Sequence, residues 1–131
     1  MADTLTVSVV TPEETVVETS ADSLVLPLFD GEAGVLKGHA PMIGRLGYGE
    51  MRITSGNETS TYYVDGGFVQ VADDVVSVLT GRAMLPTQLD AEAAAKQLEE
   101  GLARKASGDE AIAARERVVA QARAQVRLAG K

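Results

Sequence analysis

Residues 59–80 read TSTYYVDGGFVQVADDVVSVLT, and this stretch decides the fold class. Its apolar runs at 59–64, 68–71 and 75–80 are separated by Asp65-Gly66 and by Ala72-Asp73-Asp74. Short alternating runs divided by turn residues predict antiparallel strands, and Asp-Gly between two such runs predicts a hairpin. The stretch therefore predicts a β-meander.

The chain before this meander continues the same pattern. Leu5, Val7 and Val9 alternate with hydroxyl-bearing residues, which is typical of a half-buried strand. Further short strands are predicted at residues 15–18, 23–26 and 50–53. Many short strands with closely spaced turns predict a β-sandwich or a β-barrel.

The pattern changes at Pro86, which ends the last strand, and Thr87 or Asp90 can cap a following helix. Residues 89–105 and 111–128 consist largely of good helix formers. Between the two runs, Ser107-Gly108-Asp109 predicts a helix stop at Gly108 and a new N-cap at Asp109. The sequence thus predicts a β domain at residues 1–86 and an antiparallel helical hairpin at residues 87–131.

Most apolar positions expected between the two helices are alanines. The predicted stripes comprise Ala91, Ala95, Leu98, Leu102 and Ala106 in the first helix, and Ile112, Val119 and Val126, flanked by Ala111, Val118, Ala122 and Ala129, in the second. An alanine buries one methyl group, whereas a large aliphatic side chain contributes about 1.5–3 kcal/mol. Helices this short are also marginal alone. Two interpretations stay open: a reversibly attached arm, and an ordinary helical subdomain with a small interface.

Composition excludes several classes of protein. The chain has no cysteine and one histidine, so a closed Cys/His zinc site and a disulfide framework are impossible. Aromatic residues make up 4% and the net charge is −7, which argues against a nucleic-acid-binding surface. No apolar run approaches the roughly 18 residues that span a membrane. The first ten residues, MADTLTVSVV, have neither the basic start of a signal peptide nor the arginines of a transit peptide.

Charge is distributed unevenly along the chain. Residues 1–86 contain 12 acidic and four basic residues, a net charge of −8, whereas residues 109–131 contain three acidic and five basic residues, a net charge of +2. The last helix is therefore the only basic element. It is either a solvated helical face or an arm directed at an acidic protein surface.

The sequence has no phosphate-binding loop and no nucleophile-elbow serine. His39 lies in a loop beside Ala40-Pro41, and we expect it to be hydrogen-bonded and structural, because a general base needs a positioned partner and a cleft. The acidic pair Asp73-Asp74 is most simply explained by solvent exposure in a turn. From the residues alone, the chain is a non-enzymatic β-rich module with a basic helical arm.

Three motifs nevertheless point to a known family. The segment GVLKGHAPMI (34–43), the segment DGGFVQV (65–71) followed by VVSVL (75–79), and LDAEAA (89–94) occur in this order. They resemble the signature segments of the epsilon subunit of F-type ATP synthases, and the resemblance runs from about Leu5 to the end of the chain.

The resemblance implies a ten-stranded sandwich of two sheets followed by a two-helix hairpin. It also implies a rotor subunit that catalyses nothing itself, with the gamma subunit and the ring of c subunits as partners. The resemblance places Glu32 in a loop that contacts the c ring. It assigns His39, Ala40, Pro41 and Met42 to the same interface, from the neighbouring loop onward. Contact with the membrane would be indirect, through the c ring, at the cytoplasmic face of the bacterial inner membrane or the stromal face of the thylakoid.

The resemblance further implies that the hairpin alternates between a compact state and an extended state that reaches the alpha and beta subunits and inhibits ATP hydrolysis. Arg115, Arg117, Arg123 and Arg127 are the candidate inhibitory residues.

Some relatives bind ATP at the hairpin. Here Asp90 matches the family motif, and Arg123 and Arg127 lie near the positions of the family's second-helix arginines. Ala93 stands where the motif has arginine. Because a charge-assisted contact is worth about 1.5–3 kcal/mol, we expect weak or absent ATP sensing and no cofactor.

Two rival interpretations remain. One is a free-standing β-sandwich that binds another protein and carries a helical tail. The other is a hydrolase that uses His39.

Overall fold

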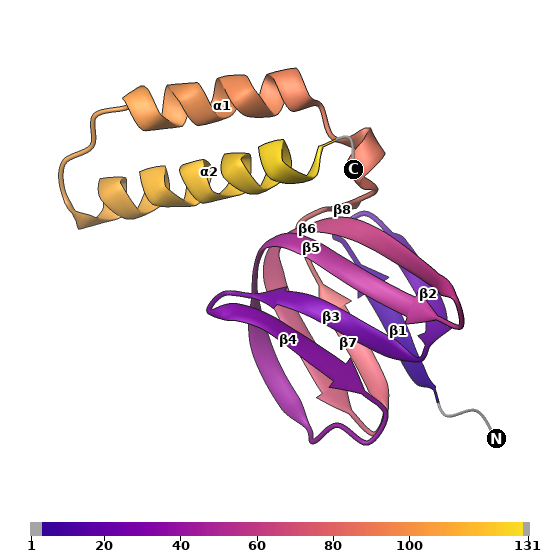
Figure 1. Cartoon of the computed structure of the whole chain (residues 1–131). Helices are drawn as coiled ribbons and strands as arrows, with labels where there is room; N and C mark the ends of the chain where they lie inside the picture. The colour runs from indigo at the N-terminus through magenta and orange to yellow at the C-terminus, as the bar shows by residue number, and fades with distance from the viewer. Residues whose placement is uncertain (1–3, 130–131) are drawn as a thin grey trace. The chain divides into compact units, whose positions relative to one another are not determined.

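The computed structural model describes residues 4–129, and the chain divides into two compact units, Met1–Met84 and Leu85–Lys131. Lys131, one of the five basic residues counted in residues 109–131, lies outside the described residues. Among the described residues of the first unit, all the helices and strands assigned are strands (Figure 1). They are β1 (Leu5–Val10), β2 (Thr15–Ala21), β3 (Ser23–Leu28), β4 (Gly31–Leu36), β5 (Met42–Ser55), β6 (Glu58–Ala72), β7 (Val75–Leu79) and β8 (Ala83–Met84).

The strands form one hydrogen-bonded sheet that folds over into a sandwich. Their order is β2-β1-β7-β6-β5-β3-β4, with β8 beside β6. A meander is present, because β5, β6 and β7 pair antiparallel in chain order, but the predicted runs 59–64 and 68–71 belong to one strand, β6. β1 joins this meander through a parallel pairing with β7. The β-sandwich expected from the sequence is therefore confirmed.

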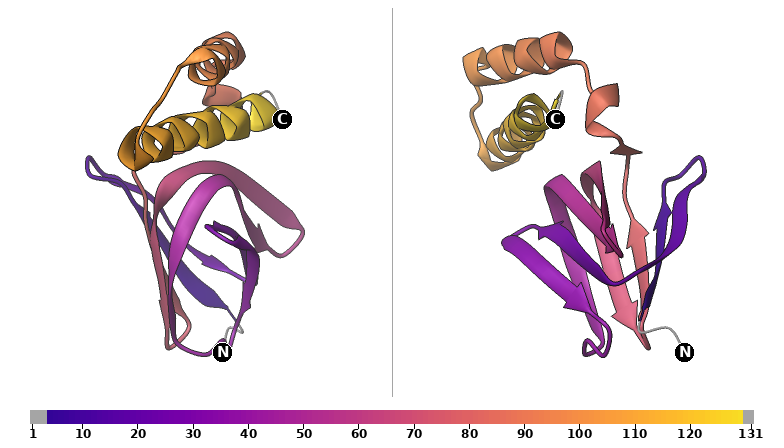
Figure 2. Two further views of the ribbon diagram at one scale, coloured as in Figure 1. Left: turned by 90° about the vertical axis from the view of Figure 1, so that its left-hand side faces the viewer. Right: turned by 45° about the vertical axis from the view of Figure 1, so that its right-hand side comes forward.

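The number of strands differs from the expected ten, because the described residues form eight. β5 has 14 residues and β6 has 15, and Figure 2 shows both curving strongly along their length. A strand that bends while its pairing continues serves both layers of a sandwich and counts once. Two long bent strands thus take the place of four short ones.

The predicted hairpin at Asp65-Gly66 is wrong, because both residues lie inside β6. Gly66 and Gly67 have φ angles of +70° and +107°, which bend the strand without ending it. A Cβ atom at Gly67 would overlap the carbonyl oxygen of Leu79. The Asp65 carboxylate accepts hydrogen bonds from Arg82 Nε (3.0 Å) and from the Tyr63 hydroxyl (3.1 Å). The Asp-Gly pair therefore builds a corner of the sandwich.

The core of the sandwich lies between its two layers and consists of large aliphatic side chains. Alternate residues of β1 and β7 point inward, as the strict alternation at Leu5, Val7 and Val9 predicted. Fully or almost fully buried are Leu5, Val7, Val9, Leu24, Leu26, Val35, Met51, Val64, Val69, Val71, Val76 and Val78. Each such side chain stabilises the fold by about 1.5–3 kcal/mol relative to exposure.

The second unit begins with a short 3-10 helix, η1 (Pro86–Gln88), followed by α1 (Ala91–Ala103) and α2 (Asp109–Leu128). Asp90 caps α1, since its carboxylate accepts a hydrogen bond from Ala93 N at 3.0 Å. Asp109 is the first residue of α2 and not its N-cap, which is Gly108 with a φ of +89°. An acidic residue in the first turn still interacts favourably with the helix dipole. Within residues 4–129, no helix is long and apolar enough to cross a membrane.

The two helices pack as an antiparallel hairpin, as predicted (Figure 1). Gln97 Nε2 donates to Gln121 Oε1 at 3.3 Å, and Gly101 lies against Val118 and Val119.

The predicted stripe is confirmed in part, because Val119 and Ala122 are buried. Its other members Ala91, Ala95, Leu102, Ala111, Ile112 and Val126 are exposed. In α1 the buried positions are Ala94 and Gly101. Glycine has no side chain, so it lets the helices approach closely. Small residues therefore determine which face of a helix packs against its neighbour, as hydrophobic residues also do.

Candidate functional site

The histidine loop joins β4 to β5 and spans residues 37–41. Its backbone turns sharply, with a φ of +84° at Gly38 and a hydrogen bond from His39 N to the Leu36 carbonyl at 3.1 Å. His39 Nδ1 lies 2.7 Å from the Ala40 carbonyl oxygen, which can only accept, so Nδ1 carries the proton. The imidazole is thus hydrogen-bonded to its own loop, as expected from the sequence.

A second turn holds this loop in place. Asp73 and Asp74 form the β6–β7 turn with φ angles of +51° and +63°, a left-handed pair typical of two-residue hairpin turns. The Asp74 carboxylate (Oδ1) accepts a hydrogen bond from Gly38 N at 2.7 Å. Solvent exposure alone therefore explains Asp73 but not Asp74, whose side chain connects two segments 36 residues apart.

The other predicted interface residues fall into two places. Ala40 and Pro41 are exposed in the loop, and Met42 is half-buried at the start of β5, packed against the core. Glu32 lies within β4, paired with Pro27 of β3, and not in a loop. Because an extended strand rises about 3.3 Å per residue, Glu32 and the histidine loop lie near opposite ends of β4.

Glu32 is part of a small ion-pair network. Arg52 Nη1 lies 2.8 Å from Glu50 Oε1 and 3.5 Å from Glu32 Oε2. The hydrogen bond to Glu50 is the largest cause that raises the pKa of Arg52, and the charges of both carboxylates add to it. Since all three side chains are partly solvated, the network orients Glu32 more than it stabilises the fold.

An exposed apolar face lies on the outside of one layer, and the sequence analysis missed it. The exposed fractions are 77% for Ile43, 57% for Phe68 and 53% for Leu79. Phe68 pairs with Arg45 of β5 on one side and with Leu79 of β7 on the other. Arg45 also places its guanidinium 4.7 Å from the centre of the Phe29 ring, which is 70% exposed.

The alternation of inward and outward side chains within β6 could have predicted this face from the sequence. Val69 and Val71 point into the core, so Phe68 must point out. We refer to Phe29, Ile43, Phe68 and Leu79 as the apolar face.

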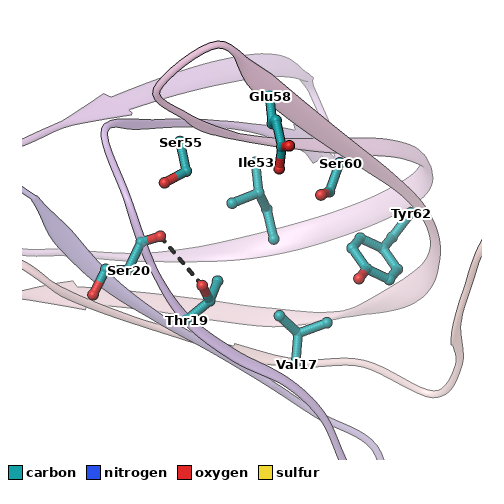
Figure 3. A pocket seen from close by; sticks show the side chains of 8 residues that line it. All are labelled: Val17, Thr19, Ser20, Ile53, Ser55, Glu58, Ser60 and Tyr62. Carbon is teal, nitrogen blue, oxygen red and sulfur yellow. Dashed lines mark hydrogen bonds between the residues drawn. The ribbon is translucent and has the colours of Figure 1, made fainter.

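An open pocket of about 270 Å³ lies between β2 and the β5–β6 hairpin. Figure 3 shows the side chains that line it: Val17, Thr19, Ser20, Ile53, Ser55, Glu58, Ser60 and Tyr62. They bring one carboxylate and several hydroxyls together, and His39 is not among them. A hydrolase based on His39 would need a cleft at its ring, and this pocket does not provide it.

The candidate arginines of the hairpin differ in their contacts. Arg115 donates from Nε to the Arg104 carbonyl (3.0 Å) and from Nη2 to the Leu102 carbonyl (3.1 Å). It therefore satisfies carbonyl groups at the C-terminal end of α1. Arg117, Arg123 and Arg127 are exposed on α2, and Arg123 and Arg127 share one face because they are four residues apart.

All residues predicted to bind a nucleotide lie in the helical unit: Asp90, Arg123 and Arg127. Asp90 is at the start of α1, and the antiparallel pairing brings the C-terminal part of α2, with Arg127, to the same end of the hairpin. The Asp90 carboxylate already accepts the Ala93 amide. Ala93 itself is exposed and offers no cation at the position where the motif has arginine.

Comparisons with known proteins agree with this architecture. Residues 4–86 match the family model of the ATP synthase delta/epsilon chain β-sandwich domain. The chain is 50% identical over 119 residues to the ATP synthase epsilon chain of Rhodopirellula baltica, covering 91% of this chain and 93% of that one. It is 32% identical over 129 residues to the sodium-ion-specific ATP synthase epsilon chain of Propionigenium modestum, covering 96% and 93%.

A solved structure supports the fold. It is a chain of the mitochondrial ATP synthase of Euglena gracilis, with a TM-score of 0.82 at 24% identity, covering 94% of this chain and 79% of that chain. From the family model, the relatives and the sandwich-plus-hairpin architecture together, the chain belongs to the family of ATP synthase epsilon chains.

Proposed function

We propose that this chain is a non-catalytic subunit of the central stalk of an F-type ATP synthase, where it couples the c ring and the gamma subunit. The relatives are named as epsilon chains of ATP synthase, and two structural neighbours come from an F1/c-ring assembly and from a central stalk with its c ring. The complex is then the enzyme, and this chain is held at the membrane through its partners.

The apolar face is the observation that carries this proposal. Two phenylalanines, an isoleucine and a leucine, each more than half exposed, are costly on a protein that works alone. Aromatic residues, together with an arginine such as Arg45, are enriched at the centres of protein interfaces. The alternative, a free-standing binding module, would leave this face in water whenever its partner is absent.

The histidine loop and Glu32 extend the proposed interface. Ala40, Pro41 and Met42 present a short apolar edge, and Glu32 offers a carboxylate that suits a basic loop of a partner. A rim contact of this kind changes the specificity and the rate of association more than the affinity. We assign Glu32 and residues 39–42 to the contacts with the c ring and the gamma subunit.

The hairpin is the proposed regulatory part. Arg117, Arg123 and Arg127 provide exposed cations for an acidic segment of the beta subunit, and their contacts inhibit ATP hydrolysis. Arg115 has a different part, because it holds the compact hairpin together through the carbonyl groups of Leu102 and Arg104.

Nucleotide control of the hairpin is expected to be weak. With alanine at position 93 and Asp90 engaged as a cap, a triphosphate would find only Arg123 and Arg127. Isothermal titration of the full chain with ATP should give no binding in the micromolar range. A micromolar dissociation constant would overturn this part of the proposal.

The assembly role is tested by co-purification. A tagged full-length chain should retrieve the gamma subunit and the c ring, and Phe68→Asp should reduce the amount retrieved at least about tenfold, since central aromatic contacts are worth more than about 1.4 kcal/mol. Ser60→Asp is the matched control, because Ser60 is exposed on the same strand and lines the pocket of Figure 3. If both the unmodified chain and Phe68→Asp purify without the gamma subunit and the c ring, the result favours the free-standing module.

A further inference from the structure

Asp74 is the point at which three separate segments of the sandwich meet. Its carboxylate accepts the Gly38 amide of the histidine loop at 2.7 Å. Its backbone carbonyl accepts the Thr6 amide, at the start of β1, at 2.9 Å. Its own φ of +63° is fixed by the β6–β7 turn. One residue thus connects the histidine loop to β1 and to the meander.

The loop that Asp74 holds turns at a glycine and is closed by local hydrogen bonds. It contains Gly38 at a φ of +84°, where a Cβ atom would meet nothing within 4 Å. The bond from His39 N to Leu36 O and the bond from His39 Nδ1 to Ala40 O are both local, spanning no more than three residues. The bond from Gly38 N to Asp74 Oδ1, by contrast, spans 36 residues. A charge-assisted bond to a backbone amide is well suited to select one conformation of a glycine-containing loop.

We propose that Asp74 is a positioning residue for docking: its carboxylate fixes the histidine loop in the shape that binds the c ring and the gamma subunit. Asp74 does not need to touch either partner. The inference rests on the proposed function, because that function places residues 39–42 at the interface. Asp74 lies outside the two places to which the proposed function assigns the contacts, Glu32 and residues 39–42.

Three variants separate positioning from charge. Asp74→Gly keeps the left-handed backbone and removes the acceptor. Asp74→Asn keeps both the backbone preference and an Oδ1 acceptor but removes the negative charge. Asp73→Gly is the control, because Asp73 occupies the same turn with a φ of +51°, is exposed, and loses the same charge.

The first readout is amide hydrogen exchange at Gly38 in the full-length chain alone, which does not depend on any partner. Asp74→Gly should speed this exchange roughly tenfold, in line with the loss of one charge-assisted hydrogen bond. Asp74→Asn should give a smaller increase than Asp74→Gly, because it keeps an acceptor without the charge, and Asp73→Gly should stay within about threefold of the unmodified chain. Unchanged exchange in Asp74→Gly would overturn the inference, whatever the function of the protein.

The second readout is the amount of each tagged variant retained on the gamma subunit and c ring. Asp74→Gly should be retained several-fold less than the unmodified chain, and Asp74→Asn should restore retention. Equal loss in Asn and Gly variants would mean that Asp74 acts as a charge on the partner, and unimpaired retention of Asp74→Gly would mean that the loop shape does not matter; either result overturns the inference. If the unmodified chain itself is not retained, the proposed function fails instead.

Discussion

The interior of the sandwich and the interior of the hairpin consist of different kinds of side chain. The sandwich buries large aliphatic residues throughout, among them Leu5, Leu24, Leu26 and Met51. In α1 the buried residues are Ala94 and Gly101, and in α2 the large apolar ones are Val119 and Leu128. Since burial stabilises by about 0.8 kcal/mol per methylene group, the hairpin interior contributes far less per residue.

This difference suits the two parts to different work. A densely packed sandwich keeps one shape and can present the apolar face and the histidine loop in fixed positions. The proposed regulatory role requires a hairpin whose free-energy gap the binding of a partner can reverse, and closure by small side chains and a few hydrogen bonds fits that requirement. A single substitution should therefore damage one part and leave the other folded.

Gly67→Ala should unfold the sandwich. The new methyl group would overlap the Leu79 carbonyl oxygen at a φ of +107°, so both the backbone and its neighbour would have to move. We expect a loss of on the order of 4 kcal/mol or more in the free energy of unfolding. Urea denaturation followed by the β-sheet signal measures it.

Gly34→Ala serves as the control for this substitution, because a Cβ atom at Gly34 would have open space and no unusual backbone angle. Its unfolding free energy should change by less than about 1 kcal/mol. If Gly67→Ala were equally mild, the corner would not need glycine.

Gly101→Leu should open the hairpin and leave the sandwich folded. A Cβ atom at Gly101 would already lie 3.1 Å from Val119 Cγ2, so a leucine has no room. Overpacking of this kind costs about 1–3 kcal/mol, which is enough to separate two marginal helices. Helical circular dichroism should fall while amide exchange in the sandwich stays unchanged.

The matched control is Ala103→Leu, on the exposed side of the same helix. Leucine is a good helix former, so this variant should keep its helical signal. Equal losses in both variants would mean that Gly101 has no special place in the packing.

Arg115→Ala should weaken the compact hairpin by about 1–2 kcal/mol, because the carbonyl groups of Leu102 and Arg104 lose two donors. Amide exchange near the end of α1 should become faster in the isolated chain. Arg117→Ala, which removes an exposed arginine two residues away, should leave that exchange unchanged. The reverse order of effects would show that Arg115 is not the residue that holds the hairpin.

The sequence was sufficient for the architecture but not for the details that depend on small residues. The alternation of apolar and polar residues identified the core strands, because periodicity reports which face is buried. Pro86 marked the change from strands to helices. Asp65-Gly66 was misread because glycine with a positive φ serves a hairpin turn and a strand corner equally well. Only the close approach of Leu79 distinguishes the two, and that contact is not local in sequence.

The candidate site was predictable to a similar extent. The hydrogen-bonded state of His39 followed from its loop context, whereas the link from Gly38 to Asp74 spans 36 residues and leaves no local signal. The apolar face was predictable in principle, since Phe68 is out of phase with Val69 and Val71. The helix seam was not, because alanine and glycine positions look alike until the helices are docked.

The most direct test of the two-part account is to remove residues 109–131 and examine the assembled complex. The shortened chain should still be retained on the gamma subunit and the c ring, because the apolar face and the histidine loop are intact. ATP hydrolysis by that complex should rise several-fold above that of the complex with the full chain. Loss of the shortened chain from the complex, or an unchanged rate of hydrolysis, would contradict the separation of a docking sandwich from a regulatory hairpin.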